Sequence, residues 1–302
     1  MKSSSAVLAA ILVSSPAAWA VISIDGTRDV EYGAALAVQT VETGFGDNFS
    51  EWNAAYAQIQ SGKLYVMLTG NLENNFNKLE IFIDSKAGGQ SVFNSAGNDG
   101  TAAMNGLVFD TGFTADYHLI VRRGFDGTDN KFDVDFADLG TTSFSSYFNI
   151  FGGAQAGVGS TGTGVNAQTI GVAYDDSNTA GVLGGSGAAD QSAALAVMTG
   201  LEFSIDLSDL GAGGDIRVMV GQNNQDHNYW SNQFLDGLPA PQGNLGGDEA
   251  GGFNGLGAID MTHFGGDQFF TVVPEPSTIA LFAAASLVVF VRACRRDQTS
   301  SR

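Results

Sequence analysis

The chain has 302 residues, of which 32 are acidic and 13 are basic, so its formal net charge is −19. A chain this acidic repels nucleic acid, and a single cysteine excludes both an internal disulfide and a cysteine-rich zinc site. Glycine supplies 41 residues without a Gly-x-y repeat, and 44% of the residues are hydrophobic, which excludes a collagen-like or a simply disordered chain.

The first 20 residues have the pattern of a secretory signal peptide, which we expect to form a short N-terminal signal helix. Lys2 supplies the positive charge, and residues 6–13 form an apolar run that is too short to span a bilayer. Ala18 and Ala20 give the small-x-small pattern at which signal peptidase cleaves. The alternative interpretation is an uncleaved N-terminal anchor.

Residues 21–273 form the body of the protein, which we expect to be a single domain. This body has 30 acidic and eight basic residues, for a net charge of −22. Short runs rich in β-branched and aromatic residues, separated by Gly, Asn, Asp and Ser, predict strands. These runs are residues 63–69, 78–84, 116–122, 131–136, 144–151, 169–174, 201–207, 216–221 and 268–273.

Several of these runs alternate between apolar and polar residues, as strands with one buried face do. Leu79, Ile81 and Ile83 share one face, whereas Glu80 lies on the other. By the same alternation we place His118 on a solvent-facing side of its strand. The pattern predicts an all-β fold, a jelly-roll-like antiparallel β-sandwich with no helix beyond a turn near residues 208–211. Long Gly-rich loops are expected at residues 152–164, 181–187 and 237–257.

The residues themselves predict no cofactor other than a structural calcium ion, for which acidic turns offer a candidate site. Asp126, Asp129 and Asp133 place oxygen ligands at short spacing, and Asn98 and Asp99 do so in another turn. Neither segment fits an EF-hand loop. The alternative is that Asp and Asn occur here because they favour turns.

A run of amides and aromatics at residues 223–232 is a candidate sugar-binding loop. Amide groups of residues such as Asn228 can bond sugar hydroxyls, while the rings of Tyr229 and Trp230 can stack on the apolar face of a sugar. The alternative is that both rings fill one end of the sandwich core, because Trp is mostly buried. Trp52 is expected in the core.

Patterns for catalysis are weak in this sequence, so we expect no enzyme. There are three histidines, no G-x-S-x-G motif, and no pair of histidines at metal-ligand spacing. A carboxylate pair could cleave a glycosidic bond, but with so many acids such pairs arise by chance. An extracellular glycan hydrolase that uses such a carboxylate pair is the alternative function.

The C-terminal residues 274–302 have the three parts of a sorting signal. Pro274, Glu275 and Pro276 come first, and the uncharged residues 277–291 follow as an expected transmembrane helix. Arg292, Arg295 and Arg296 come next, and the positive-inside rule keeps such a cluster in the cytoplasm.

This arrangement resembles the PEP-CTERM sorting signal. The resemblance implies that an exosortase, a membrane cysteine protease, recognises Pro-Glu-Pro and removes the tail, in a Gram-negative-type bacterium that makes exopolysaccharide. It implies a transient anchor in the inner membrane, followed by delivery to the cell surface or the extracellular matrix. An ordinary C-terminal anchor is the alternative.

The body resembles the family 9 carbohydrate-binding modules and the related DOMON-like sandwiches. The resemblance rests on the turn Ile24-Asp25-Gly26, the strands at residues 64–68 and 79–84, and the run from Glu202 to Leu207. It implies a sandwich fold, and it leaves open a DOMON-like cofactor-binding module. Together, the motifs predict an exported structural or adhesive protein that contacts extracellular polysaccharide.

Overall fold

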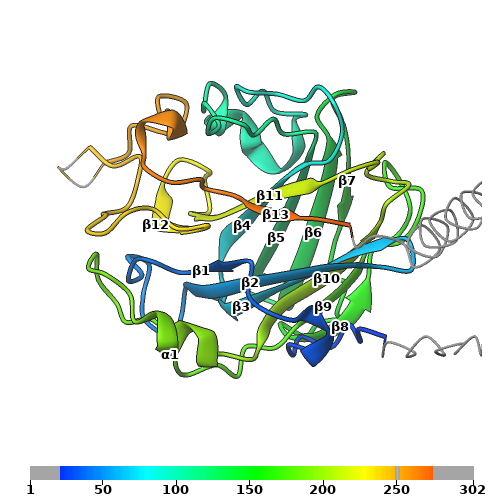
Figure 1. The fold of residues 1–302 in the computed structure, drawn as a ribbon, viewed down its shortest axis with the longest axis horizontal. Helices are drawn as coiled ribbons and strands as arrows, with labels where there is room; N and C mark the ends of the chain where they lie inside the picture. The colour runs from blue at the N-terminus through cyan, green and yellow to red at the C-terminus, as the bar shows by residue number, and fades with distance from the viewer. Residues whose placement is uncertain (1–20, 249, 251, 275–302) are drawn as a thin grey trace, which may run out of the picture.

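The computed structural model describes residues 21–248, 250 and 252–274, which form two antiparallel β-sheets packed face to face (Figure 1). One sheet has six strands in the order β1-β2-β3-β10-β9-β8. The other has seven strands, in the order β12-β11-β4-β5-β6-β7 with β13 also paired to β11. The predicted all-β class with two antiparallel layers is confirmed.

The bounds of the elements follow from the hydrogen-bonded ladders. The six-stranded sheet contains β1 (Ala37–Val38), β2 (Glu51–Gln60), β3 (Lys63–Asn71), β8 (Gly157–Ser160), β9 (Gly171–Tyr174) and β10 (Gly200–Asp206). The seven-stranded sheet contains β4 (Asn75–Asp84), β5 (Tyr117–Phe125), β6 (Asn130–Asp138), β7 (Ser143–Tyr147), β11 (Ile216–Asn223), β12 (Trp230–Leu235) and β13 (Phe270–Val272). The helical elements are α1 (Gln191–Ala196), η1 (Val30–Tyr32), η2 (Asn98–Met104) and η3 (Met261–His263).

Parts of the predicted sorting machinery lie outside the described residues. These are the signal peptide with Ala18 and Ala20, the motif residues Glu275 and Pro276, the apolar run 277–291, and Arg292, Arg295 and Arg296. Within the described part of the chain, no helix is long and apolar enough to cross a membrane.

Each of the nine predicted runs overlaps a strand, and four further strands were not predicted: β1, β2, β8 and β12. β2 escapes notice because its alanines and amides give no clean alternation, and β8 lies inside the stretch predicted as the Gly-rich loop 152–164. The short helix α1 was not predicted either, because six residues are too few to show helical periodicity. Asp190 caps it by accepting from the backbone N–H groups of Ser192 (2.9 Å) and Ala193 (3.2 Å).

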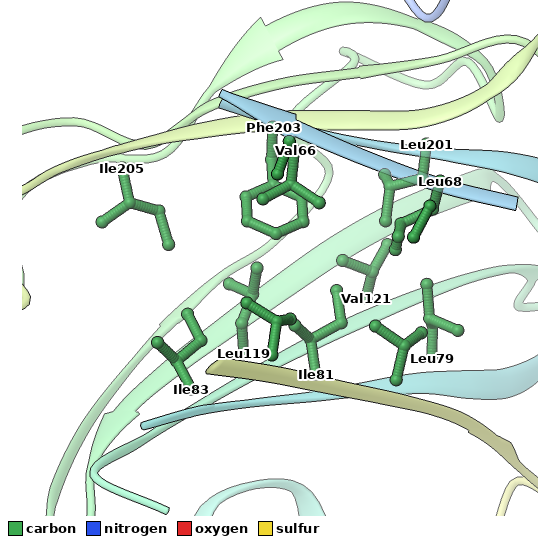
Figure 2. Close-up of a cluster of buried hydrophobic side chains, with 14 of the residues drawn as sticks. Val66, Leu68, Leu79, Ile81, Ile83, Leu119, Val121, Leu201, Phe203 and Ile205 are labelled. Carbon is green, nitrogen blue, oxygen red and sulfur yellow. The ribbon is translucent and has the colours of Figure 1, made fainter. Parts of the chain in front are cut away.

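The main core lies between the two sheets and follows the predicted alternation. Leu79, Ile81 and Ile83 of β4 face Phe203 and Ile205 of β10 across the sandwich (Figure 2). All five side chains have no exposed surface. Burial of each one stabilises the fold by about 1.5–3 kcal/mol, so this core holds the two sheets together.

The outer faces of both sheets are covered, which corrects the prediction that they meet solvent. On the seven-stranded sheet, Phe82 packs in a second core with Phe93 and Phe109, under the segments before β5 and after β12. Glu80 and His118 lie on this covered face and have no exposed surface. The alternation was correct, but polar residues in the outward positions pair with one another beneath the loops instead of meeting water.

The outer face of the six-stranded sheet holds a second buried carboxylate, Glu202. Its Oε2 accepts from the backbone N–H groups of Asp25 (2.8 Å) and Gly26 (3.0 Å), and its Oε1 accepts from the Tyr32 hydroxyl (2.7 Å). Gly26 has φ +84° and lies so close to the chain that a Cβ would be 2.9 Å from the backbone nitrogen of Asp175. The Ile-Asp-Gly turn is thus fastened to the strand that carries Glu202.

Burial raises the pKa of Glu202 to about 7, although the hydrogen bonds from Tyr32, Gly26 and Asp25 favour its charged form. Since the unfolded carboxyl titrates near its ordinary pKa of about 4.3, the native state holds the proton more tightly between these two pH values. Glu202 therefore lowers the stability of the protein as the pH rises from about 4.5 to 7.

We predict that Glu202→Gln gains stability relative to the wild type as the pH rises through this window, because the amide has no charge to bury. Urea unfolding at several pH values between 4 and 8 measures the difference in free energy. Asp226→Asn, which changes an exposed acid, is the control. A difference between Glu202→Gln and wild type that stays constant with pH would contradict the prediction.

Candidate functional site

A buried charge network on the outer face of the seven-stranded sheet centres on Glu80 of β4. Its Oε2 is 2.7 Å from Nε2 of His118 on β5, and its Oε1 is 2.6 Å from Nδ1 of His227 in the loop between β11 and β12. Asn223 of β11 also donates to Oε1, at 3.1 Å. One carboxylate therefore joins three strands and a loop.

Asp99 of η2 extends this network toward the surface. Its Oδ2 is 3.3 Å from Nε2 of His227, 3.3 Å from Nζ of Lys78 and 3.3 Å from Nη1 of Arg122. Arg122 is also 3.3 Å from Oδ1 of Asp135 on β6. These ion pairs connect η2 to the sheet. The neighbouring loops pack on the same sheet through the apolar side chains of the second core.

The titration of the network follows from this pairing. Burial alone would raise the pKa of Glu80, but the charge of His227 and hydrogen bonds from both histidines outweigh it and hold that pKa well below its usual range. Burial alone would lower the pKa of His227, but the charge of Glu80 and hydrogen bonds with Asp99 and Glu80 raise it to about 9. His227 is therefore a buried imidazolium at neutral pH.

The loop between β11 and β12, which carries His227, also carries two of the predicted sugar-binding residues. Asn224 closes the loop: its backbone N–H donates to the Tyr229 carbonyl (2.9 Å), and its side chain accepts from the Asn228 backbone (3.0 Å) and donates to Asn228 Oδ1 (2.7 Å). Asn228 and Tyr229 are half-buried. The loop is thus tied to the charge network through His227 and closed on itself through Asn224.

Three rings from separate loops form what we call the aromatic strip: Phe45, Tyr229 and Phe253. Tyr229 stacks on Phe45 with centroids 5.8 Å apart and planes at 19°, and its ring lies 4.9 Å from that of Phe253. Phe253 is 53% exposed. Tyr229 is a predicted site residue, but neither phenylalanine was predicted, because they are separated from it by 184 and 24 positions in the chain.

Trp230, the third residue of the predicted sugar-binding set, lies in the second core. It has no exposed surface and packs edge-on against Phe234, with centroids 5.0 Å apart. Adjacent residues of an extended strand point to opposite sides, so Tyr229 and Trp230 cannot both face outward. Trp230 therefore offers no ring face to a sugar, and Trp52 is likewise buried, with its Nε1 donating to Gln222 (2.9 Å).

The three aspartates of the candidate calcium site are not brought together as a ligand set. Asp126 and Asp129 lie in the turn between β5 and β6, where both are paired with Lys131 at 3.3 and 3.4 Å. Asp133 is buried farther along β6, 3.7 Å from Arg122 Nε, and accepts from the Asn149 backbone at 2.7 Å. Across the described residues, no group of three or more His, Cys, Asp and Glu side chains is placed to hold a metal ion.

The other predicted acidic turn contributes Asp99, which the charge network uses. Its oxygen lies among a lysine, an arginine and a protonated histidine, so the turn already has its positive partners. The pKa of Asp99 is lowered: burial alone would raise it, but the hydrogen bond with His227 and the charges of Arg122 and Lys78 prevail.

Comparison with known proteins identifies the C-terminal segment. A family model described as the PEP-CTERM protein-sorting motif matches residues 272–296, which confirms the predicted sorting signal. The motif supports an exported protein that an exosortase processes, with a transient C-terminal membrane anchor before display at the cell surface. No curated protein and no solved structure matches the chain.

We predict that the charge network makes the fold sensitive to alkaline pH. Because the pKa of His227 is raised to about 9 from about 6.5 in the unfolded chain, its contribution is complete below pH 6.5 and is lost as the pH rises through 9. Wild type should therefore lose more stability between pH 6.5 and 9.5 than His227→Gln does.

Urea unfolding of both proteins across this range makes the comparison. His263→Gln removes a histidine whose side chain is 79% exposed and should leave the pH dependence of wild type unchanged. Parallel curves for wild type and His227→Gln would show that the imidazolium adds no pH-dependent stability.

Proposed function

We propose that this protein is a non-enzymatic component of the cell surface or exopolysaccharide matrix, and that its body contacts extracellular polysaccharide. In this proposal signal peptidase removes residues 1–20, the C-terminal helix holds the chain transiently in the inner membrane, and an exosortase then releases it. The sorting motif supports export, and the aromatic strip is the observation on which polysaccharide contact rests.

The aromatic strip has the chemistry that a polysaccharide surface needs. Aromatic rings offer flat apolar faces, and their side chains have few rotatable bonds to order on binding. Pyranose rings present apolar C–H faces that can stack on them. Tyr229 also carries a hydroxyl, and Asn228 and Asn254 are its neighbour and that of Phe253 in the chain. We propose that these amides bind sugar hydroxyls, as the sequence pattern indicated for Asn228.

The architecture of the body is compatible with the resemblance to carbohydrate-binding β-sandwich modules. The chain changes sheet between β3 and β4, between β7 and β8, and between β10 and β11, a jelly-roll-like course that we interpret as one domain over residues 21–273. The Ile24-Asp25-Gly26 turn and the Glu202 strand, which carry the family 9 resemblance, meet in a direct contact. The proposed role needs no cofactor, and a calcium ion at the Asp126–Asp129 turn stays a separate proposal.

Tyr229→Ala should reduce retention of the purified chain in affinity gels that contain the exopolysaccharide of the producing cells, because it removes the central ring of the strip. We expect at least a fivefold weaker retention. Phe144→Ala, which removes a 43% exposed ring from β7, is the matched control. Equal mobility of wild type and Tyr229→Ala at every polysaccharide concentration would rule out the strip as the contact.

The same preparations distinguish a binding protein from the alternative, a glycan hydrolase that uses a carboxylate pair. Prolonged incubation with the exopolysaccharide should release no new reducing ends if the protein only binds. Release that increases in proportion to protein concentration would instead favour the hydrolase.

Replacing Pro274, Glu275 and Pro276 together by alanine should block exosortase processing in the producing cells. The chain should then keep its C-terminal segment and stay in the membrane fraction, whereas wild type should be shorter and reach the surface fraction. Intact mass and immunoblots of the fractions measure both effects. Pro239→Ala, in an exposed loop of the body, is the control, and normal processing of the triple variant would contradict the proposal.

A further inference from the structure

A polar cleft of about 400 Å³ lies at the loop that precedes β2, next to but separate from the aromatic strip. It is formed by the loop before β2, the β3–β4 connection, the end of β5 and the segment after β9. Its lining residues are Asn48, Phe49, Asn71, Glu73, Asn74, Arg123 and Asp176. Such a volume is at the lower end of the range for small-ligand sites, enough for a short saccharide unit.

One buried polar atom of a residue that lines this cleft has no hydrogen-bond partner. Asn71 is 3% exposed, and its Nδ2 donates to the backbone carbonyls of Asn48 (2.8 Å) and Asn178 (2.9 Å), while its Oδ1 accepts nothing. Such a spare acceptor matches the O–H of a hydroxyl group.

The charges around the cleft disfavour an anionic ligand. Arg123 is fixed by a hydrogen bond from Nε to the Leu72 carbonyl (2.5 Å), by an ion pair with Asp176 (2.5 Å) and by the ring of Tyr174, 4.9 Å away. Because Arg123 and Asp176 neutralise each other, the carboxylate of Glu73 leaves the lining with a net negative charge, which repels an anion. Phe49, 65% exposed, adds an apolar surface at the same cleft.

A larger cleft of about 430 Å³, lined by Lys86, Asp215 and Arg217 among others, lacks these features. Arg217 is paired there with Asp84 (3.1 Å), and Lys86 donates to the Tyr117 hydroxyl (2.8 Å). No polar side-chain atom that lines this larger cleft is buried without a partner. We therefore do not infer a binding site at this cleft, although it is the larger of the two.

We propose that the Asn71 cleft binds a neutral, hydroxyl-rich saccharide unit. Asn71 Oδ1 accepts from a sugar hydroxyl, and Phe49 packs on the apolar face of the ring. This is a second contact beyond the proposed function, since Phe49 and the strip residue Phe45 occupy the same loop but belong to different sites. A polysaccharide chain could contact both sites at once.

An array of neutral, uronic-acid and amino-sugar disaccharides, probed with the purified full chain, tests the cleft directly. We expect binding to neutral disaccharides, weakened at least tenfold in Phe49→Ala and in Asn74→Ala, both changes at exposed positions. Phe144→Ala, an exposed phenylalanine on β7, should bind within twofold of wild type.

Tyr229→Ala separates this cleft from the aromatic strip. It should retain disaccharide binding even if it loses retention by the whole polysaccharide, so the two proposals can fail independently. The cleft proposal is overturned if no neutral disaccharide binds, if only acidic or amino sugars bind, or if Phe49→Ala binds as wild type does.

Discussion

The buried carboxylate of Glu80, held between two histidines, is the interaction on which the outer layer of the seven-stranded sheet depends. A fully buried charge is tolerated only when it is paired and hydrogen-bonded, and here His118, His227 and Asn223 complete it. Breaking such a pair by removing one partner typically costs about 3–5 kcal/mol, because the remaining charge stays buried. Glu80 therefore ties the loop that carries His227 to the strands beneath it.

This constraint links the interior to the surface. His227 lies in the same short loop as Tyr229, and Asn224 closes that loop with hydrogen bonds at both ends. The ring of Tyr229 therefore meets Phe45 and Phe253 at a fixed place, although the three come from distant segments. A rigid set of rings can bind without ordering itself first, which favours affinity.

The sequence predicted the fold well where burial acts through neighbours in the chain. Alternation located β4, β6 and β10, and the face of Leu79, Ile81 and Ile83 is the face that the core uses. The same alternation could not tell that Glu80 and His118 are buried, because Glu80 pairs with His118 at a distance of 38 positions and with His227 at more than a hundred. The Asn71 cleft and the phenylalanines of the strip were invisible for the same reason: each is assembled from loops whose contacts depend on tertiary structure.

The position of β13 has a mechanical consequence for a chain that carries a sorting motif immediately after it. Phe270–Val272 pairs with Ile216–Val218 at the edge of β11, and only Val273 separates this strand from Pro274. No flexible stalk lies between the folded body and the motif, so during anchoring the body must lie close to the membrane surface. Any pull between body and anchor is therefore transmitted first to this three-residue strand.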